Sequence, residues 1–294
     1  MSDPLAPIRA GLAARVAGWG AMDLAAIRAD FAAFLTEVGP EGAALARPRA
    51  TRVAGLEAVW IGDPAAKPGL YLHGGGFQIG GIASHAGLAA RLAQALGLRL
   101  LLPAYRLAPE HRFPAAHDDA LAVLRAMQAA GEAPVAILGD SAGGGLALST
   151  AIRARDAGLP LPRALMLLSP WLDLSLSGAS YRDLAAEDPF SKPAQLAAMA
   201  RSYLGRGGPA PDDPAVSPLF ADFHDLPPLL IHAGGTDITL DDSRRLAARP
   251  EARVTLRIHP GMCHHFQVFE GLPPAETSLA EIGVWWRALP RNPR

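Results

Sequence analysis

Residues 135–150 read VAILGDSAGGGLALST, and this stretch decides the fold class of the chain. The apolar run at its start is typical of a buried strand, and the residues after the glycines are typical of a helix. Between them, Gly139 and Gly143 flank Ser141 in a G-x-S-x-G pattern, in which glycine permits a sharp turn from strand to helix. Such a turn presents the serine hydroxyl at the end of the strand. The pattern predicts a nucleophilic Ser141, and the alternative is a glycine-rich turn in which Ser141 only caps the helix.

The composition is that of a globular protein with a large core. Of the 294 residues, 50% are hydrophobic and 19% are charged, which argues against disorder. The net charge of −1 gives no electrostatic attraction to nucleic acid or to a membrane surface, so neither is expected as a partner. Cys263 is the only cysteine, which excludes an intrachain disulfide and a cysteine-based metal cluster. The chain start lacks the pattern of a signal peptide, and we expect a cytoplasmic protein.

From Gly69 onward the chain alternates between strand and helix patterns. The expected strands are 70–73, 98–103, 134–139, 164–169, 228–233 and 252–259, preceded by short strands at 52–56 and 58–61 around a turn at Gly55. The expected helices are 85–96, 114–130, 142–157, 192–204, 241–248 and 275–289. This alternation predicts an α/β fold, with a mostly parallel central sheet flanked by helices on both faces.

Two segments stand outside this alternation. Residues 5–38 have apolar positions at helical spacing, which predicts two short helices that end near Gly39-Pro40 and pack over the domain. Residues 171–226 are too long for an ordinary connection, and such insertions are often caps or lids. We therefore divide the chain into an N-terminal helical cap segment (1–50) and a catalytic domain (51–294) that carries a cap insertion.

An acid and two histidines follow later strands of the predicted sheet. A serine hydroxyl becomes a good nucleophile only when a base takes its proton and a third group orients that base. Asp237 comes directly after one strand, and His264 and His265 come after the next. Because such groups gather at the carboxyl ends of parallel strands, we expect them beside Ser141. At this point both histidines are candidates for the base.

Other residues nearby have simpler interpretations. Asp237 is favoured as the acid because it lies in the strand-end turn, whereas Asp241 and Asp242 suit helix capping. His259 falls within a strand pattern and is expected to be packed. No carboxylate stands at metalloprotease spacing from these histidines, so no metal is expected.

The run His73-Gly74-Gly75-Gly76 follows the first strand of the alternation. Backbone N–H groups in such a loop can hold the oxyanion that forms when a carbonyl carbon becomes tetrahedral. The alternative is a nucleotide-binding glycine loop. That loop needs a lysine after its glycines or a third glycine at the fingerprint spacing, and the run has neither.

With these motifs in order, the chain resembles the hormone-sensitive-lipase-like α/β-hydrolases, especially their bacterial esterases and lactone hydrolases. The likeness runs from about residue 52 to 289. It rests on six blocks, HGGGF (73–77), AYRLAPEHRFPAAHDDA (104–120), GDSAGGGLA (139–147), SPWLDLSLSG (169–178), GGTDITLDD (234–242) and PGMCHHFQVF (260–269). The family commonly has glycine or a small apolar residue where this chain has His265.

The resemblance implies an α/β-hydrolase fold with a helical cap formed by residues 1–50 and parts of 171–215. It further implies Ser141 as nucleophile, Asp237 as acid and His264 as base, and it implies no cofactor. The implied oxyanion donors are the backbone N–H groups of Gly75, Gly76 and Ala142. The last strand would be a sheet edge, where pairing with a second copy would give a homodimer.

These observations predict a serine carboxylesterase that cleaves small-molecule esters of short to medium acyl chains, or lactones, through an acyl-enzyme. The same site could serve an amidase, a transacylase or a lyase, and some relatives of this fold are ligand-binding proteins without catalysis. The aromatic residues of the cap segments predict an apolar mouth. These residues are Trp19, Phe31, Phe34, Tyr181, Phe190, Tyr203 and Phe220.

Overall fold

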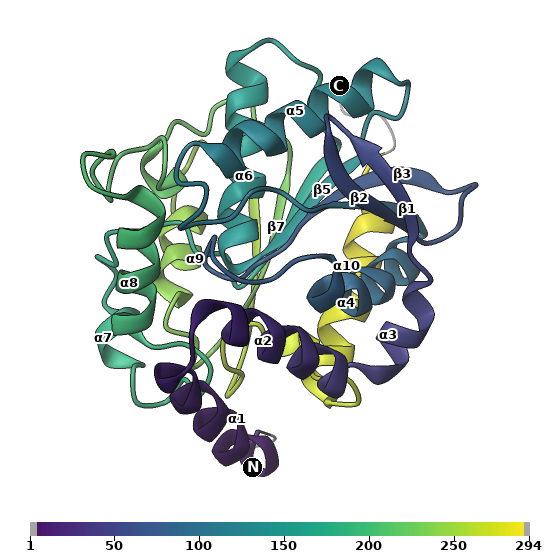
Figure 1. Ribbon diagram of the computed structural model, residues 1–294. Helices are drawn as coiled ribbons and strands as arrows, with labels where there is room; N and C mark the ends of the chain where they lie inside the picture. Colours follow the sequence, from purple (N-terminus) through teal and green to yellow (C-terminus); the bar gives the residue numbers. More distant parts are fainter. Residues whose placement is uncertain (1–4, 291–294) are drawn as a thin grey trace.

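One eight-stranded sheet forms the centre of the protein (Figure 1), and its strand order is β1-β2-β4-β3-β5-β6-β7-β8. The structure is a computed structural model that describes residues 5–290. The strands are β1 (Arg49–Val53), β2 (Leu56–Ile61), β3 (Lys67–Leu72), β4 (Leu98–Pro103), β5 (Ala136–Asp140), β6 (Ala164–Leu168), β7 (Leu229–Gly234) and β8 (Val254–His259). β2 runs antiparallel to β1 and β4, and all other neighbouring strands are parallel. The prediction of a mostly parallel sheet is confirmed, and β8 is an edge strand as expected. The outer limits of the two predicted domains fall at residues 1–4 and 291–294, outside the described residues.

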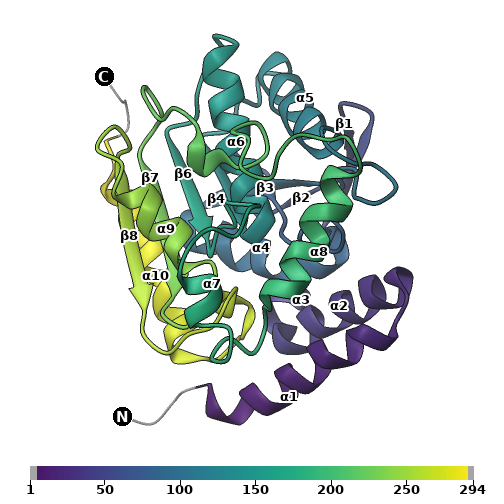
Figure 2. The same cartoon turned by 90° about the vertical axis from the view of Figure 1, so that its left-hand side faces the viewer.

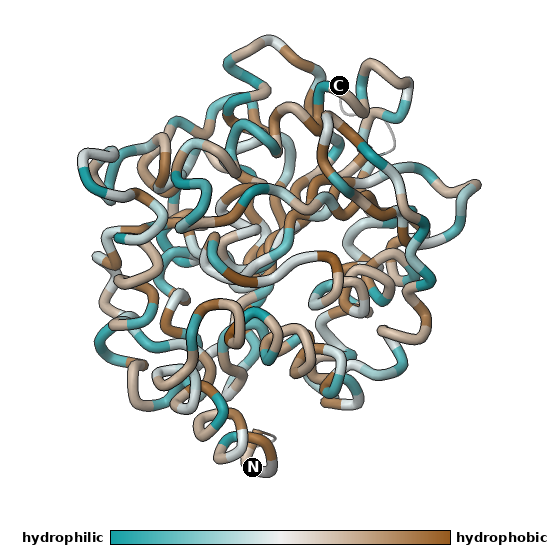
Figure 3. The backbone as a smooth tube through the Cα atoms, in the orientation of Figure 1, coloured by the Kyte–Doolittle hydropathy of each residue, from teal (hydrophilic) through white to brown (hydrophobic). Residues whose placement is uncertain are grey.

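The sheet separates two apolar layers. Along β5, Ile137 belongs to the core on one face, and Ala136 and Leu138 belong to the core on the other. None of the three is more than 1% exposed. The central strands are continuous apolar runs because both faces of the sheet are covered. In Figure 3 the brown, apolar stretches accordingly run through the middle of the molecule.

Helices cover both faces, as the alternation predicts. One layer contains α5 (Ala115–Ala129), α6 (Ser141–Asp156) and α9 (Leu240–Ala247). The opposite layer contains α4 (Ile82–Leu96) and α10 (Pro273–Ala288). In this arrangement the chain leaves β3, β5, β7 and β8 at one edge of the sheet, where the predicted site residues follow (Figure 1).

The N-terminal segment forms the two helices predicted for residues 5–38 and a third, short helix after them. These are α1 (Ala6–Gly18), α2 (Leu24–Val38) and α3 (Pro40–Ala46). The second helix ends at Val38 with Gly39 as its C-cap, so the predicted end near Gly39-Pro40 is confirmed. Pro40 then begins the third helix, because proline is well suited to the first position of a helix, where its missing N–H is not needed. In Figure 2, α1 and α2 lie side by side at one end of the molecule, next to α8 (Pro193–Leu204) of the insertion.

The boundary between the first two strands also differs from the prediction. The turn falls at Ala54 and Gly55, with φ of +52° and +80°, so Leu56 belongs to β2 and not to the preceding strand. Two residues with positive φ are typical of a tight hairpin whose twist matches that of the flanking strands.

The insertion contains little regular structure. Its helices are α7 (Ser180–Asp183), α8 and the short 3₁₀ turn η2 (Pro218–Phe220). The rest is loop, fixed by polar contacts described below. Across residues 5–290, no helix has both the length and the apolar character that a membrane crossing requires.

Candidate active site

Ser141 lies at the junction of β5 and α6, with a backbone φ of +50°. This conformation is strained for a residue with a side chain, so it persists only where the surroundings fix it. A Cβ atom added to Gly143 would lie 2.1 Å from the carbonyl oxygen of Leu72 and 2.3 Å from that of His73. Gly143 therefore lets α6 begin directly against the end of β3, and the close packing holds the turn.

His264 bridges Ser141 and Asp237. Its Nε2 lies 2.8 Å from Ser141 Oγ, and its Nδ1 lies 3.0 Å from Asp237 Oδ1. Asp237 stands in the turn after β7, where its Oδ1 also accepts hydrogen bonds from the backbone N–H and the hydroxyl of Thr239, at 2.8 and 2.9 Å. The structure thus brings together the three residues predicted as nucleophile, base and acid. His265, the other candidate base, contacts neither Ser141 nor Asp237 by a hydrogen bond.

The charges of this group strengthen the base. Burial alone would lower the pKa of His264, but the charge and hydrogen bond of Asp237 outweigh it and raise that pKa above 6.5. Burial would raise the pKa of Asp237, but the His264 charge and the bonds from Thr239 hold it below its ordinary value. Asp237 is therefore ionised at neutral pH, and His264 accepts a proton more readily than a free histidine.

Asp188 is a second buried carboxylate beside this group, and sequence analysis missed it. It comes from the insertion, and its Oδ2 accepts a hydrogen bond from the backbone N–H of Ile238, the residue after Asp237, at 3.2 Å. Burial and the Asp237 charge raise the pKa of Asp188 to about 6. Its own charge helps to raise the pKa of His264. No motif or periodicity marks this position, because it lies in irregular chain.

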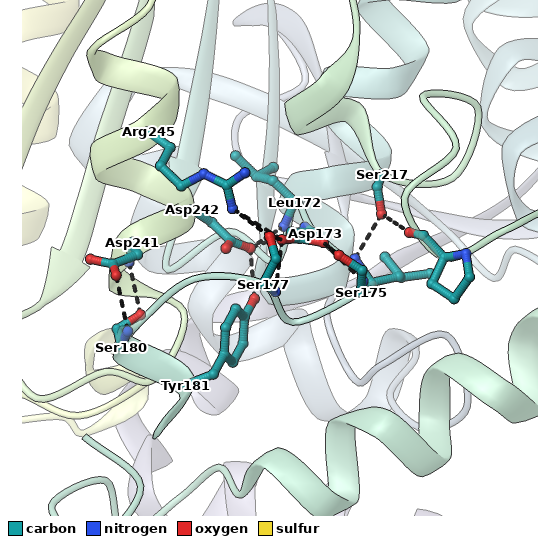
Figure 4. A network of polar contacts seen from close by, with 12 residues as sticks. Leu172, Asp173, Ser175, Ser177, Ser180, Tyr181, Ser217, Asp241, Asp242 and Arg245 are labelled. Carbon is teal, nitrogen blue, oxygen red and sulfur yellow. Dashed lines mark hydrogen bonds and ion pairs between the residues drawn. The ribbon is translucent and has the colours of Figure 1, made fainter. Parts of the chain in front are cut away.

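A network of polar contacts fixes the start of the insertion against α9 (Figure 4). Asp242 Oδ2 accepts hydrogen bonds from the backbone N–H of Leu172 at 2.8 Å and from the hydroxyl of Tyr181 at 2.7 Å. Asp241 Oδ2 accepts from the backbone N–H of Ser180 at 2.9 Å. The two carboxylates hold loops in place, as Figure 4 shows, and neither bonds to the histidine of the site.

The glycine-rich loop lies at the same edge of the sheet. Gly75 and Gly76 have φ of +110° and +60°, a region that favours glycine, and both line a cavity together with Ser141. Ala142, the next residue of α6, is fully buried. The backbone N–H of Gly74 donates to Asp140 Oδ1 at 3.0 Å, which attaches the loop to the residue before Ser141.

The sequence profile of the α/β hydrolase fold matches residues 69–268. The chain belongs to the α/β-hydrolase fold family. The hydrolase is 39% identical to an acetyl-hydrolase of Streptomyces hygroscopicus, over 78% of this chain and 79% of the relative. It is 36% identical to an esterase of Acinetobacter venetianus, over 82% of each chain. A crystal structure of an esterase from the bacterial hormone-sensitive lipase family superposes with a TM-score of 0.90 at 34% identity, covering 98% of this chain and 99% of the other. The predicted resemblance and the predicted fold class are confirmed.

The cavity of the hydrolase above Ser141 is small, at about 30 Å³. Its floor includes Ser141, His264 and the glycine loop, and its apolar walls come from the N-terminal helices, the insertion and Ile79, which follows the glycine loop. These walls are Trp19, Phe31, Ile79, Phe190, Leu196 and Met199. Of the aromatic residues expected at an apolar mouth, Phe34, Tyr181, Tyr203 and Phe220 do not line this cavity.

The walls are attached to the hydrolase core at specific points. Arg28 of α2 donates to the backbone carbonyl oxygens of Gln78 and Ala108 at 2.8 and 3.0 Å, and it pairs with Glu110 at 2.8 Å. Ring contacts join Phe31 of α2 to Phe190 of the insertion, with 6.5 Å between ring centroids. The two segments that wall the cavity therefore touch each other as well as the core.

A second histidine–carboxylate cluster lies behind the glycine loop of the hydrolase. Asp140, His85 and His265 are all buried, and Oδ2 of Asp140 lies 3.4 Å from His85 Nε2 and 3.2 Å from His265 Nε2. Burial lowers the pKa of His265 to about 4, so this imidazole is neutral at pH 7. From the sequence, His265 was expected only as a candidate base, and the cluster was not predicted. Nothing in the spacing of residues 85, 140 and 265 shows that they meet.

Proposed function

We propose that this α/β hydrolase is a serine carboxylesterase acting through an acyl-enzyme, with Ser141 as nucleophile, His264 as base and Asp237 as orienting acid. The observation that carries the proposal is the chain of hydrogen-bonding contacts from Asp237 through His264 to Ser141. Ser141 and His264 line a cavity together with the glycine loop. The named relatives, an acetyl-hydrolase and an esterase, support the hydrolysis of carboxylic esters.

The geometry supports a sequence of proton transfers through one imidazole. His264 Nε2 takes the proton of Ser141 Oγ as the oxygen attacks the ester carbonyl carbon, and Asp237 stabilises the imidazolium that forms. The backbone N–H groups of Gly75, Gly76 and Ala142 hold the oxyanion, and each donor of this kind is worth about 2.7–4 kcal/mol in the transition state. His264 then protonates the departing alkoxide. Water, activated by the same imidazole, hydrolyses the acyl-enzyme.

The size of the cavity limits the acyl chains that a substrate can carry. A volume of about 30 Å³ leaves room for a very small group beside Ser141, so acetyl esters fit with the least movement of the walls. Met199 of α8 closes the space over the glycine loop, because a Cβ added to Gly76 would lie 2.2 Å from its Sδ. We propose that short acyl chains, acetyl above all, are preferred, and that longer chains or lactones enter only when the walls move.

The wall residues support a division of the chain into core and cap. We propose that the N-terminal helices and the insertion at 171–226 together form the cap, and that the rest of the chain is the catalytic domain. Trp19 and Phe31 of the first segment and Phe190 and Met199 of the second meet over Ser141.

The test compares p-nitrophenyl acetate, butyrate, octanoate and palmitate as substrates of wild type and of Ser141→Ala. We expect saturable turnover by wild type, falling from acetate to palmitate. In the variant, kcat is expected to fall by about 10⁶-fold, as when the nucleophile of a triad is removed. A variant with wild-type turnover would refute the serine mechanism. A wild type that prefers palmitate would refute the assignment of short acyl chains.

A further inference from the structure

The cluster of His85, Asp140 and His265 has unsatisfied polar atoms that lie close together. Their Nε2, Oδ2 and Nε2 atoms are buried and have no hydrogen-bond partner within residues 5–290. The two contacts to Asp140 Oδ2, at 3.4 and 3.2 Å, therefore lack the alignment of hydrogen bonds. Buried polar groups almost always have partners, so three orphaned atoms in one place require an explanation.

The other polar atoms of the His85 and Asp140 side chains already have partners. Nδ1 of His85 lies 2.7 Å from the hydroxyl of Ser84. Asp140 Oδ1 accepts hydrogen bonds from the hydroxyl of Tyr71 at 2.5 Å and from the backbone N–H of Gly74 at 3.0 Å. Contacts of this kind fix the orientation of metal ligands in proteins. In His85 and Asp140 they leave only Nε2 and Oδ2 free to bind a ligand.

The spacing of the unsatisfied atoms fits a metal ion. Ligand atoms about 2.0–2.1 Å from a tetrahedral zinc ion are about 3.3–3.4 Å from one another. The two measured separations, 3.4 and 3.2 Å, agree with this value, and all three atoms lie within 4.8 Å of one another. Two imidazoles and one carboxylate are a donor set that zinc and similar divalent ions accept.

We propose that His85, Asp140 and His265 form a site for a divalent transition-metal ion of the zinc class. The ion is no part of the proposed ester hydrolysis. Asp140 directly precedes Ser141 and accepts a hydrogen bond from the backbone N–H of Gly74. An ion bound to Asp140 therefore displaces both the nucleophile and the oxyanion loop. Occupancy of the site therefore slows ester hydrolysis, and removal of the ion restores it.

The first test is cobalt binding, which needs no catalytic activity. Full-length protein is dialysed against EDTA and then titrated with Co²⁺, whose visible d–d absorption reports tetrahedral coordination. We expect one Co²⁺ per chain with a dissociation constant of about 1 μM or tighter, displaced by Zn²⁺. His265→Gln and His85→Gln each remove one ligand, and each is expected to weaken binding by at least about 100-fold.

The matched control is His259→Gln. It removes another buried histidine, which with His232 and Glu281 belongs to a different group of metal-ligating residues. This variant is expected to bind Co²⁺ as wild type does. Circular dichroism and thermal melting show which variants are folded. If one ligand variant does not fold, the other still tests the site.

Two results would overturn the proposal. The first is a wild-type protein with no saturable Co²⁺ absorption up to about 1 mM, which would refute a metal site at this cluster. The second is Co²⁺ binding that is lost in His259→Gln and retained in both ligand variants. Either result leaves the proposed ester hydrolysis standing, because absorption is measured without a substrate.

Activity gives the second readout. Zn²⁺ is expected to lower kcat/KM of wild type at least tenfold, and EDTA is expected to restore it. For each ligand variant, kcat/KM is measured with and without Zn²⁺. We expect no difference between the two values at the Zn²⁺ concentration that inhibits wild type. Equal inhibition of wild type and the ligand variants would refute the coupling between this site and Ser141.

Discussion

Replacing Gly143 by alanine tests the connection between the fold and the site most directly. The added Cβ would lie 2.1 and 2.3 Å from the carbonyl oxygens of Leu72 and His73, whereas real Cβ contacts are at least 3.0 Å. Both oxygens belong to the backbone, so a side-chain rotation cannot relieve the overlap. The end of β3 or the start of α6 must move by about 0.9 Å.

This movement has two measurable costs. Overpacking of this kind destabilises a core by about 1–3 kcal/mol, and each kcal/mol lowers Tm by roughly 2–4 °C in a domain of more than 150 residues. The displaced end of β3 leads into the glycine loop, and a misplacement of about 1 Å in an active site costs about 100-fold in rate. We therefore expect Gly143→Ala to lower Tm by several degrees and kcat/KM for p-nitrophenyl acetate by about 100-fold.

Gly11→Ala is the matched control. Gly11 lies inside α1, and a Cβ there would meet no atom within 4 Å. Alanine is favoured over glycine in a helix by about 0.5–1 kcal/mol, so this variant should melt slightly higher than wild type and keep its activity. A Gly143→Ala protein with wild-type Tm and a kcat/KM within about threefold of wild type would refute the steric argument.

Three further predictions concern the charges and walls of the site. Asp237→Asn should lower kcat about 10⁴-fold with little change in thermal melting, because asparagine favours the wrong tautomer of His264. A loss of kcat of less than about tenfold would exclude Asp237 as the orienting acid. The neutral form of His264 is the base and its pKa is raised, so kcat/KM should fall as the pH drops through a value above 6.5. Asp188→Asn removes one charge that raises this pKa, so the variant should lose kcat/KM at a lower pH than wild type. An unmoved pH profile would contradict the effect of Asp188 on His264. Met199→Ala should raise the ratio of butyrate to acetate hydrolysis, measured as kcat/KM, and an unchanged ratio would show that Met199 does not limit acyl length.

The sequence predicted the sheet because its signals are local. Apolar runs and glycine-rich turns mark β5 and the junction at Ser141, and the order of strands and helices follows from the alternation. The carboxyl-edge rule then predicted that Asp237 and the histidine pair His264 and His265 lie beside Ser141, and the family resemblance implied His264 as the base. The contacts of His264 with Asp237 and Ser141 agree with that expectation. Where two short strands meet at a tight turn, as at Ala54 and Gly55, the predicted boundary was wrong.

Contacts between irregular segments could not be predicted in this way. Asp188 lies beside Ile238 because the insertion folds back onto the turn after β7, and no periodic pattern describes that path. His85 and His265 meet Asp140 from a helix and a loop on two other parts of the chain. Their proximity depends on packing among loops, for which a single sequence has no periodic signal.

The direction of β3 has a practical consequence for handling the protein. β3 begins at Lys67 and ends just before the glycine loop, and at about 3.3 Å per residue its two ends are more than 15 Å apart. The chain has two lysines. Lys67 is exposed, whereas Lys192 is half-buried and its Nζ donates to the carbonyl oxygens of Ala185 and Asp188 at 2.9 and 2.6 Å. Amine coupling to a solid support through lysine therefore favours Lys67 and leaves the cavity facing the solution.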